Sequence, residues 1–133
     1  MRYFVCLMAL VTIAVAEPRA GYYRYPSINE KTIVFTAEGD LWIVPIEGGA
    51  ARRLTSHPGQ ETNAAISPDG KTVAFTAEYE GPAEVYTISI DGGMPVRRTW
   101  DGGRGQVAGW TRDGRILYST NRYSTLPNAK LVA

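Results

Sequence analysis

The segment TIVFTAE at residues 32–38 recurs almost unchanged as TVAFTAE at residues 72–78. Phe35 and Phe75, the aromatic residues of these copies, are 40 residues apart, and Tyr118 of a looser third copy, RILYST, follows after another 43 residues. Repeats of about this length are typical of folds that stack one small structural unit several times. The β-branched and aromatic residues of the segment favour a strand, so the repeated unit is expected to be built from strands.

The residues between these copies repeat in the same order. Three segments recur: LWIVPIEGG (41–49) as VYTISIDGG (85–93), SPDG (67–70) as TRDG (111–114), and RRLT (52–55) as RRTW (97–100). The Asp-Gly and Gly-Gly pairs predict tight turns, because glycine adopts positive φ without a steric clash. The turns therefore divide each unit into short strands that follow one another along the chain.

Each unit contains four candidate strands. In the second unit, these strands are expected at about residues 63–66, 72–77, 84–90 and 96–99. Four antiparallel strands in about 40 to 45 residues predict the blade of a β-propeller. We therefore expect an all-β chain with no long helix, in the form of an incomplete ring of two four-stranded blades and part of a third.

The blade boundaries follow from the same spacing. The expected blades are blade 1 at about residues 25–62, blade 2 at about 63–106 and a partial blade 3 at about 107–133. Phe35, Phe75 and Tyr118 are expected to be equivalent core positions, and Trp42 and Tyr86 to pack between blades. Propellers typically have four to eight blades, so this chain alone is expected to be a fragment with an open blade face, and therefore to aggregate or form oligomers.

The first 16 residues do not belong to the repeats. Arg2 precedes an apolar run from Phe4 to Val15, and Ala14-Val15-Ala16 supplies small residues at a cleavage position. This arrangement predicts a signal peptide at residues 1–16, and the run is too short to span a bilayer. Residues 17–133 are therefore expected to be exported, with the periplasm as the expected compartment, and to have no membrane span after cleavage.

Composition excludes several classes of function. The chain has 133 residues, 14 Lys and Arg, 13 Asp and Glu, and a formal net charge of +1. The basic residues occur singly or in pairs, whereas nucleic-acid binding requires a clustered basic surface, so no nucleic-acid partner is expected. The single cysteine, Cys6, lies in the predicted signal peptide, which leaves no cysteine for a disulfide or a thiolate metal site.

Candidate catalytic residues are few. His57 is the only histidine, and with Ser56 or Ser67 and a carboxylate it could form a triad. However, Ser56 and His57 are neighbours in a Thr-Ser-His-Pro-Gly turn, and the chain has no Gly-x-Ser-x-Gly motif. His57 is therefore expected to be a turn residue, and no catalytic residue is predicted.

Candidate metal and cofactor ligands are equally sparse. Glu78, Glu80 and Glu84 could bind calcium, but they lack an Asp-rich loop and flank Gly81-Pro82, which predicts a solvated hairpin. Asp69 and Asp113 are expected to form turns, and the Gly102–Gly105 segment is expected to be a loop between blades because it lacks the ending of a phosphate-binding loop. No metal-binding or cofactor-binding residue is predicted.

Six short segments resemble the start of tricorn-type proteases. They are RYPSI (24–28), EGDLW (38–42), EGG (47–49), RRLTSHPG (52–59), AEYEG (77–81) and GWT (109–111). The resemblance covers about residues 22–133. The S-P-D-G turn and the strand ending in Glu/Asp-Gly-Gly also resemble the repeats of the Tol-system periplasmic propeller protein, but these features are common in exported propellers.

The tricorn resemblance implies a function in peptide selection. In that family, propellers precede a PDZ domain and a serine protease domain, whose nucleophile lies beyond this chain, and the propeller is thought to channel peptides to the active site. This implies an N-terminal propeller fragment of an exported serine peptidase, with peptide or protein substrates as partners and a homo-oligomer at full length. The alternatives are a non-catalytic Tol-like binding propeller and the propeller of another hydrolase, of the dipeptidyl-peptidase or amidohydrolase type.

Overall fold

The computed structural model describes residues 21–133, apart from residues 101 and 126. The predicted signal peptide at residues 1–16 lies outside this range. Within it, the chain forms eleven β-strands and no helix, so the predicted all-β class is confirmed. No helix long and apolar enough to cross a membrane occurs in the described part.

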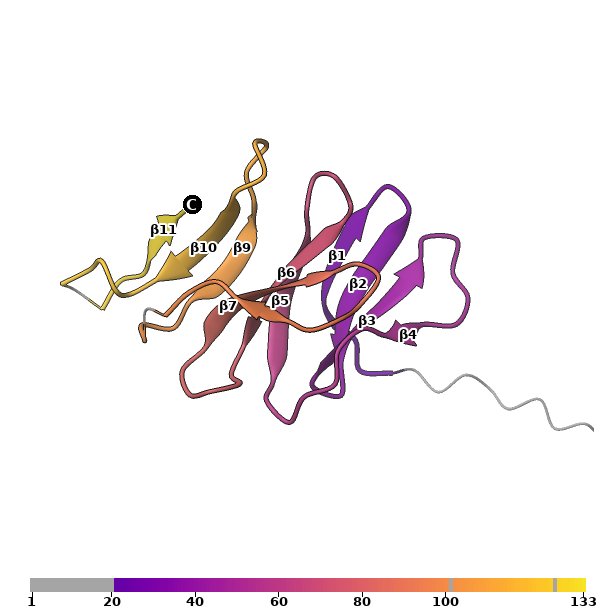
Figure 1. Ribbon diagram of the computed structural model, residues 1–133, viewed down its shortest axis with the longest axis horizontal. Coiled ribbons are helices and arrows are strands. Elements are labelled where there is room, and N and C mark those ends of the chain that lie inside the picture. Colours follow the sequence, from indigo (N-terminus) through magenta and orange to yellow (C-terminus); the bar gives the residue numbers. More distant parts are fainter. Residues whose placement is uncertain (1–20, 101, 126) are drawn as a thin grey trace, which may run out of the picture.

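The strands form three antiparallel sheets, each built from consecutive strands (Figure 1). Sheet 1 contains β1 (Arg24–Asn29), β2 (Thr32–Ala37), β3 (Asp40–Pro45) and β4 (Arg52–Arg53). Sheet 2 contains β5 (Glu61–Ile66), β6 (Thr72–Ala77), β7 (Glu84–Ser89) and β8 (Val96–Arg97). Sheet 3 contains β9 (Gln106–Trp110), β10 (Ile116–Thr120) and β11 (Lys130–Val132). The four strands expected in the second unit are thus present, although the first begins two residues earlier.

The hairpin that joins β5 to β6 illustrates how the sequence forms these turns. Gly70 has a φ of 72°, which its missing Cβ allows, and its amide donates to the carbonyl of Ser67. The hydroxyl of Ser67 donates to Asp69 Oδ1 at 2.6 Å and accepts the amide of Thr72 at 3.0 Å. The serine and the aspartate therefore stabilise the turn backbone, which is the role predicted for Asp69.

Strand register confirms that the repeated residues are equivalent. Phe35 pairs with Trp42 in sheet 1, and Phe75 pairs with Tyr86 in sheet 2. Tyr118 occupies the same place on the central strand of sheet 3. We call the face of each sheet that carries this aromatic residue its front face, and the opposite face its back face.

The register corrects one expected correspondence. The sequence suggested that Arg52-Arg53 matches Arg97-Arg98, but Trp42 pairs with Arg53 whereas Tyr86 pairs with Arg97. Arg53 is therefore the structural counterpart of Arg97. An alignment of the two units on their Arg-Arg pairs is therefore shifted by one residue from the structural alignment. The strand pairing decides which residues are equivalent, because side chains alternate between the two faces of a sheet at each position.

Two apolar clusters hold the sheets together. The front face of sheet 2 packs on the back face of sheet 1, in a cluster that includes Phe75, Tyr86 and Leu41. The front face of sheet 3 packs on the back face of sheet 2 through Val107 and Tyr118 against Ala74 and Val85. Sheet 2 is consequently covered on both faces, and all of β6 except Thr72 is buried.

The expected core positions differ in burial. Phe75 is fully buried and Tyr86 is 5% exposed, whereas Phe35 and Tyr118 are only partly buried. Trp42, which was expected to pack between blades, is also only partly buried. For Phe35 and Trp42 the reason is position in the stack, because no described sheet lies in front of sheet 1. The prediction of an open blade face is therefore confirmed for Phe35 and Trp42.

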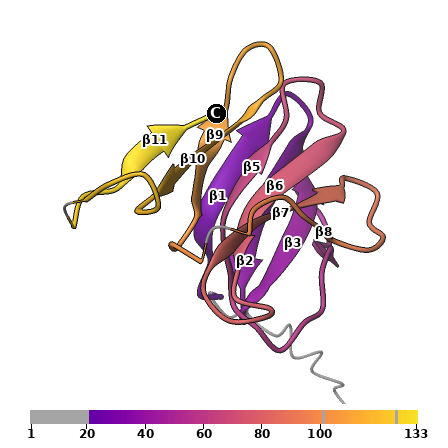
Figure 2. The same ribbon diagram turned by 60° about the vertical axis from the view of Figure 1, so that its left-hand side comes forward.

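The first strands of the three sheets lie next to one another. Strand β5 contacts β1 on one side and β9 on the other, and the two views agree on this arrangement (Figures 1 and 2). These inner strands are the edge strands of their sheets, and β4 and β8 lie at the opposite edges of sheets 1 and 2. The sheets thus radiate from a shared inner wall, as the blades of an incomplete propeller.

Candidate functional site

The inner wall is a hollow surface with almost no charge. All three inner strands line a cavity of about 650 Å³. Their exposed residues are Tyr25, Pro26, Ile28, Gln106 and Ala108. The charged residues within these strands are Arg24, at one end of β1, and Glu61, whose side chain is fully buried. The cavity is also lined by the exposed Glu30 of the β1–β2 turn, so a chain lying on this wall would meet uncharged exposed side chains along the strands and one carboxylate at the turn.

Each inner strand is distorted at the same position. The pairing of β1 with β2 shifts between Arg24 and Ser27, and the pairing of β5 with β6 shifts between Thr62 and Ala65. The β9–β10 ladder shifts at the corresponding place. The inserted residue Tyr25 has a φ of 50°, and its counterpart Asn63 has a φ of 51°. Bulges of this kind twist an edge strand and make it a poor template for pairing with another chain.

Side chains from neighbouring sheets form hydrogen bonds with backbone or side-chain groups of the inner strands and with Ser67, which directly follows β5. The four hydrogen bonds join the amide of Ile66 to Ser27 Oγ (3.1 Å), Asn29 Nδ2 to the carbonyl of Ser67 (3.0 Å), the amide of Val107 to Thr76 Oγ1 (2.9 Å) and Trp110 Nε1 to the carbonyl of Ala65 (2.9 Å). With these groups occupied, the wall offers side chains, rather than a continuous free strand edge, to a passing polypeptide.

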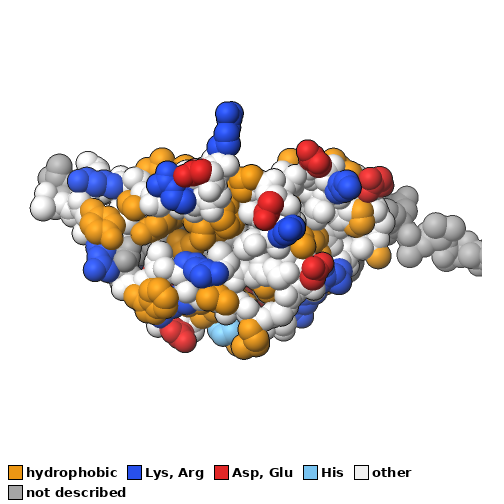
Figure 3. Space-filling model, turned by 45° about the horizontal axis from the view of Figure 1, so that its top comes forward, with side chains coloured by type: hydrophobic (Ala, Val, Ile, Leu, Met, Phe, Trp, Pro, Cys, Tyr) orange, Lys and Arg blue, Asp and Glu red, His pale blue; other side chains and the backbone are white. Residues whose placement is uncertain are grey.

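A second hollow lies on the side of the stack opposite the inner wall, and we call it the rim groove. Its volume is about 770 Å³, and it runs between the segment after β4 and strand β8. His57, Tyr79 and Tyr86 form its aromatic base, with ring centroids 3.8 Å apart for His57–Tyr79 and 4.7 Å apart for Tyr79–Tyr86. Met94 and Trp100 flank the groove and are 87% and 67% exposed. Figure 3 shows hydrophobic side chains gathered near the histidine.

His57 lies in the turn expected for it. Its Nδ1 accepts the amide of Gly59 at 3.0 Å, and its own amide donates to Asp40 Oδ1 at 3.2 Å. Ser67 lies at the other end of β5, in the β5–β6 hairpin, where its hydroxyl is bonded to that turn. The structure therefore does not bring His57 and Ser67 together. No hydrogen bond links His57 to a serine hydroxyl among the side-chain contacts of the described residues.

In each of the first two sheets, a carboxylate at the start of the third strand binds residues of the fourth strand and of the segment that follows it. Asp40 forms an ion pair with Arg53, and Glu84 forms one with the equivalent Arg97 at 3.3 Å. Glu84 also accepts the amide of Gly102 at 2.9 Å and the hydroxyl of Thr99. Asp40 and Glu84 are 2% and 1% exposed, so both carboxylates are buried, whereas the side chain of Arg53 is exposed and that of Arg97 is partly exposed. We call these two arrangements the carboxylate latches.

The acidic hairpin differs from the prediction at one residue. Glu78 and Glu80 are exposed, as expected for a solvated hairpin, and Glu80 pairs with Arg97 at 2.8 Å. Glu84 was expected to be solvated with them, but it is buried in its latch. The side-chain direction at Glu84 is set by the register of β7 and not by the turn. Among the described residues, no His, Cys, Asp and Glu side chains form a group that could hold a metal ion.

Glu61 is the ionisable residue that the sequence analysis missed. It begins β5, is fully buried, and accepts hydrogen bonds from the amide of Leu41 (3.0 Å) and from the hydroxyls of Thr55 and Tyr79. Desolvation by burial raises the pKa of Glu61, although these hydrogen bonds oppose the shift. Burial also raises the pKa of Tyr79, which keeps it a hydrogen-bond donor. The third unit has Gly105 at the position of Glu61, so the carboxylate does not recur and the repeats gave no signal for it.

The pKa values of the two turn aspartates, Asp69 and Asp113, are shifted in the opposite direction. The hydroxyl of Ser67 lowers the pKa of Asp69, and the hydroxyl of Thr111 lowers the pKa of Asp113. Both aspartates are therefore charged acceptors within their own hairpins at neutral pH. The Gly102–Gly105 segment connects β8 to β9, and Gly105 donates its amide to the carbonyl of Ala83. This is the connection between sheets that was expected for it.

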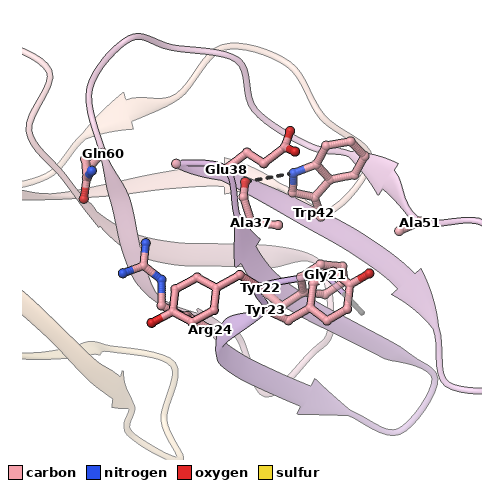
Figure 4. A pocket seen from close by; sticks show the side chains of 11 residues that line it. Gly21, Tyr22, Tyr23, Arg24, Ala37, Glu38, Trp42, Ala51 and Gln60 are labelled. Carbon is pink, nitrogen blue, oxygen red and sulfur yellow. Dashed lines mark hydrogen bonds between the residues drawn. The ribbon is translucent and has the colours of Figure 1, made fainter. Parts of the chain in front are cut away.

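The front face of sheet 1 carries a third hollow, of about 580 Å³ (Figure 4). Tyr23 packs edge to face on Phe35 at 5.1 Å, and the indole of Trp42 donates to the carbonyl of Ala37 at 3.1 Å. The guanidinium of Arg24 lies 5.1 Å from the ring centre of Tyr22. This hollow occupies the place that, in front of sheet 2, is filled by the back face of sheet 1.

Most of the chain is similar in sequence to known proteins. Residues 20–132 match the family model described as the tricorn protease N-terminal β-propeller domain. The chain is 40% identical over 107 residues to tricorn protease homolog 1 of Streptomyces coelicolor, which covers 79% of this chain and 10% of that relative. It is 31% identical over 112 residues to the putative tricorn-like protease N-terminal subunit of Sulfurisphaera tokodaii, covering 80% of this chain and 56% of the relative.

Solved structures give the same picture of the fold. The crystal structure of the tricorn protease superimposes with a TM-score of 0.69 and 27% identity, over 78% of this chain and 11% of that one. The structure of TolB from Acinetobacter baumannii gives a TM-score of 0.68 and 21% identity, over 84% of this chain and 29% of that one. The chain thus spans between a tenth and just over half of the length of the proteins it matches.

Proposed function

Because the chain belongs to the tricorn protease N-terminal β-propeller family, we propose that it is the propeller component of an exported serine peptidase and guides unfolded peptides along its inner wall. In this proposal, the peptide bond is cleaved by a domain outside this chain. The name of the Sulfurisphaera tokodaii relative, an N-terminal subunit, supports the idea that such a propeller can act as a separate subunit.

The observation that carries the proposal is the neutral, bulged inner wall. A conduit for peptides of many sequences should not bind one charge pattern, and the exposed residues of the three inner strands are uncharged. It should also not retain peptides as an added strand. The bulges at Tyr25 and Asn63, together with the side-chain hydrogen bonds to the inner strands, disfavour that mode of binding.

The contacts of His57 and Ser67 support a structural role for both residues. The imidazole accepts a backbone amide and stacks on Tyr79, and Ser67 is engaged in its own hairpin. Proton abstraction from a serine requires hydroxyl and imidazole within hydrogen-bonding distance, directly or through one water. We therefore expect this chain to lack peptidase activity and to contribute substrate selection.

The test measures binding of a fluorescein-labelled oxidised insulin B chain, an unfolded peptide, by anisotropy. Ile28→Asp places a charge on the inner wall at a position that is 64% exposed, and it should weaken binding. The matched control is Met94→Asp in the rim groove, which should leave binding unchanged. Equal affinity of all three proteins would contradict the proposal, as would cleavage of the peptide by the wild type that Ser67→Ala or His57→Ala abolishes.

The rim groove favours a second candidate function, a binding propeller that recruits a protein partner and catalyses nothing. Its support is the exposure of Trp100 and Met94 beside an aromatic base, because tryptophan and methionine are enriched in interface cores. In the anisotropy experiment, this function predicts that Met94→Asp, and not Ile28→Asp, weakens binding.

A further inference from the structure

One charged side chain borders the hollow of the inner wall. Among the described residues that line this hollow of about 650 Å³, Glu30 is the one with an ionisable side chain. It lies in the turn between β1 and β2 and is exposed. Its backbone amide is bonded to Asn29, but its carboxylate forms no hydrogen bond or ion pair with another described residue. The carboxylate is therefore available to a ligand in the hollow.

The turn that carries Glu30 is held in place by the neighbouring sheet. Asn29 Oδ1 accepts the amide of Glu30 at 2.6 Å, and Asn29 Nδ2 donates to the carbonyl of Ser67 at 3.0 Å. These bonds fasten the β1–β2 turn to the β5–β6 hairpin, which lies beside it (Figure 1). Because the backbone beneath the carboxylate is already ordered, a ligand that binds there loses little free energy to the ordering of the turn.

The charges near Glu30 favour a cation. A smaller hollow of about 290 Å³ shares Glu30 with the first one and is also lined by Lys31 and Asp69. The hydroxyl of Ser67 lowers the pKa of Asp69, so this carboxylate is charged at neutral pH. Two carboxylates and one ammonium group thus line the two hollows. Their net negative charge is complementary to a positively charged group.

The rest of the larger hollow suits an aliphatic side chain. Pro26 is exposed, Ile28 is 64% exposed, and Trp110 is partly buried. The indole of Trp110 donates to the carbonyl of Ala65 at 2.9 Å, which fixes the ring. Lysine and arginine place their methylene stems on apolar surface and keep the charged group at the end in a polar environment. Apolar walls with one carboxylate at their edge match this shape and charge.

From these observations, we propose that Glu30 binds a lysine or arginine side chain of a peptide that lies on the inner wall. The inference rests on the proposed function and adds to it a preferred charge at one place. The exposed residues of the inner strands are uncharged, so the preference is confined to the end of the wall at the β1–β2 turn. The remainder of the peptide can vary, whereas an acidic residue at this end is repelled.

The test uses three short peptides that differ at their central residue, which is lysine, glutamine or glutamate. The other residues are alanine, serine and leucine, both ends are blocked, and the dye is uncharged, so the central residue supplies the charge. Binding is measured by anisotropy with the wild type, Glu30→Gln and Glu78→Gln. The last variant is the matched control, because Glu78 is an exposed carboxylate in the β6–β7 hairpin, at the opposite end of sheet 2. Circular dichroism verifies that each variant is folded.

The wild type and Glu78→Gln should bind the lysine peptide about two- to fivefold more tightly than the glutamine peptide, as for other exposed ion pairs. Both should bind the glutamate peptide more weakly than the glutamine peptide. Glu30→Gln should bind the lysine and glutamine peptides with equal affinity. Added salt should reduce the preference of the wild type, because it screens the charges.

Equal affinity of the wild type for all three peptides would overturn the role of Glu30, as would a lysine preference that survives Glu30→Gln. Loss of the preference in Glu78→Gln would also overturn it, because the effect would then come from net charge and not from this site. The proposed function would still stand in these cases if the glutamine peptide binds and Ile28→Asp weakens its binding. Failure of every peptide to bind the wild type would overturn both.

Discussion

Replacement of Phe75 by alanine should strongly destabilise the stack of sheets. The ring is fully buried and lies 6.0 Å from Tyr86 and 6.3 Å from Tyr79, in the cluster that joins sheets 1 and 2. Substitution of a buried phenylalanine by alanine typically costs about 3–5 kcal/mol, and the cost rises with the cavity that remains. Here the cavity would be lined by two hydrogen-bonded sheets that can collapse only in part. We therefore expect a loss of about 4 kcal/mol.

Phe35→Ala is the matched control, because Phe35 occupies the same position in sheet 1 and is only partly buried. Its loss should cost about 1–2 kcal/mol, in proportion to the smaller apolar area removed from water. Urea unfolding followed by circular dichroism measures both values, at a concentration low enough to keep the chain monomeric. Equal losses for the two variants would refute the reasoning, since they would mean that packing between sheets adds nothing at Phe75.

Three further predictions test single features. Because burial raises the pKa of Glu61, the stability that this residue contributes should be largest below the ordinary pKa of 4.5 and should fall as the pH rises through the raised value. Glu61→Gln should remove this pH dependence from the free energy of unfolding, measured with urea between acidic and neutral pH. A variant with the pH profile of the wild type would contradict the prediction. Asn63→Val should cost about 1–2 kcal/mol in the same assay because a β-branched residue is strained at a φ of 51°, whereas Asn63→Gly should be nearly neutral. N-terminal sequencing of the exported protein should begin at Glu17, and an intact Met1 in the cytosol would disprove the predicted signal peptide.

The sequence was sufficient to predict the strands and their grouping. The recurrence of Phe35 at Phe75 identified equivalent positions, and the Asp-Gly turns located the hairpins. These features are local or periodic, so one chain displays them without any comparison. The repeat also predicted that one blade face would be open.

The buried polar groups could not be predicted in this way. Glu61 is buried because it meets Leu41 of the preceding sheet and Thr55 of the segment after β4, and neither contact is visible in the local sequence around Glu61. Glu84 was misjudged because its neighbours Glu78 and Glu80 are exposed, whereas the register of β7 directs Glu84 into a carboxylate latch. Register and contacts between sheets are tertiary properties, and a single-residue shift reverses the side of the sheet that a residue faces.

The most direct test of the proposed function is to map where an unfolded peptide contacts the chain. Backbone amide chemical shifts of the labelled protein would be recorded as the oxidised insulin B chain is added. We expect the largest changes on the inner strands, around Ile28 and Ala108, with the rim groove unaffected. Changes confined to the surroundings of His57 and Trp100, with none on the inner strands, would contradict the proposal that peptides follow the inner wall.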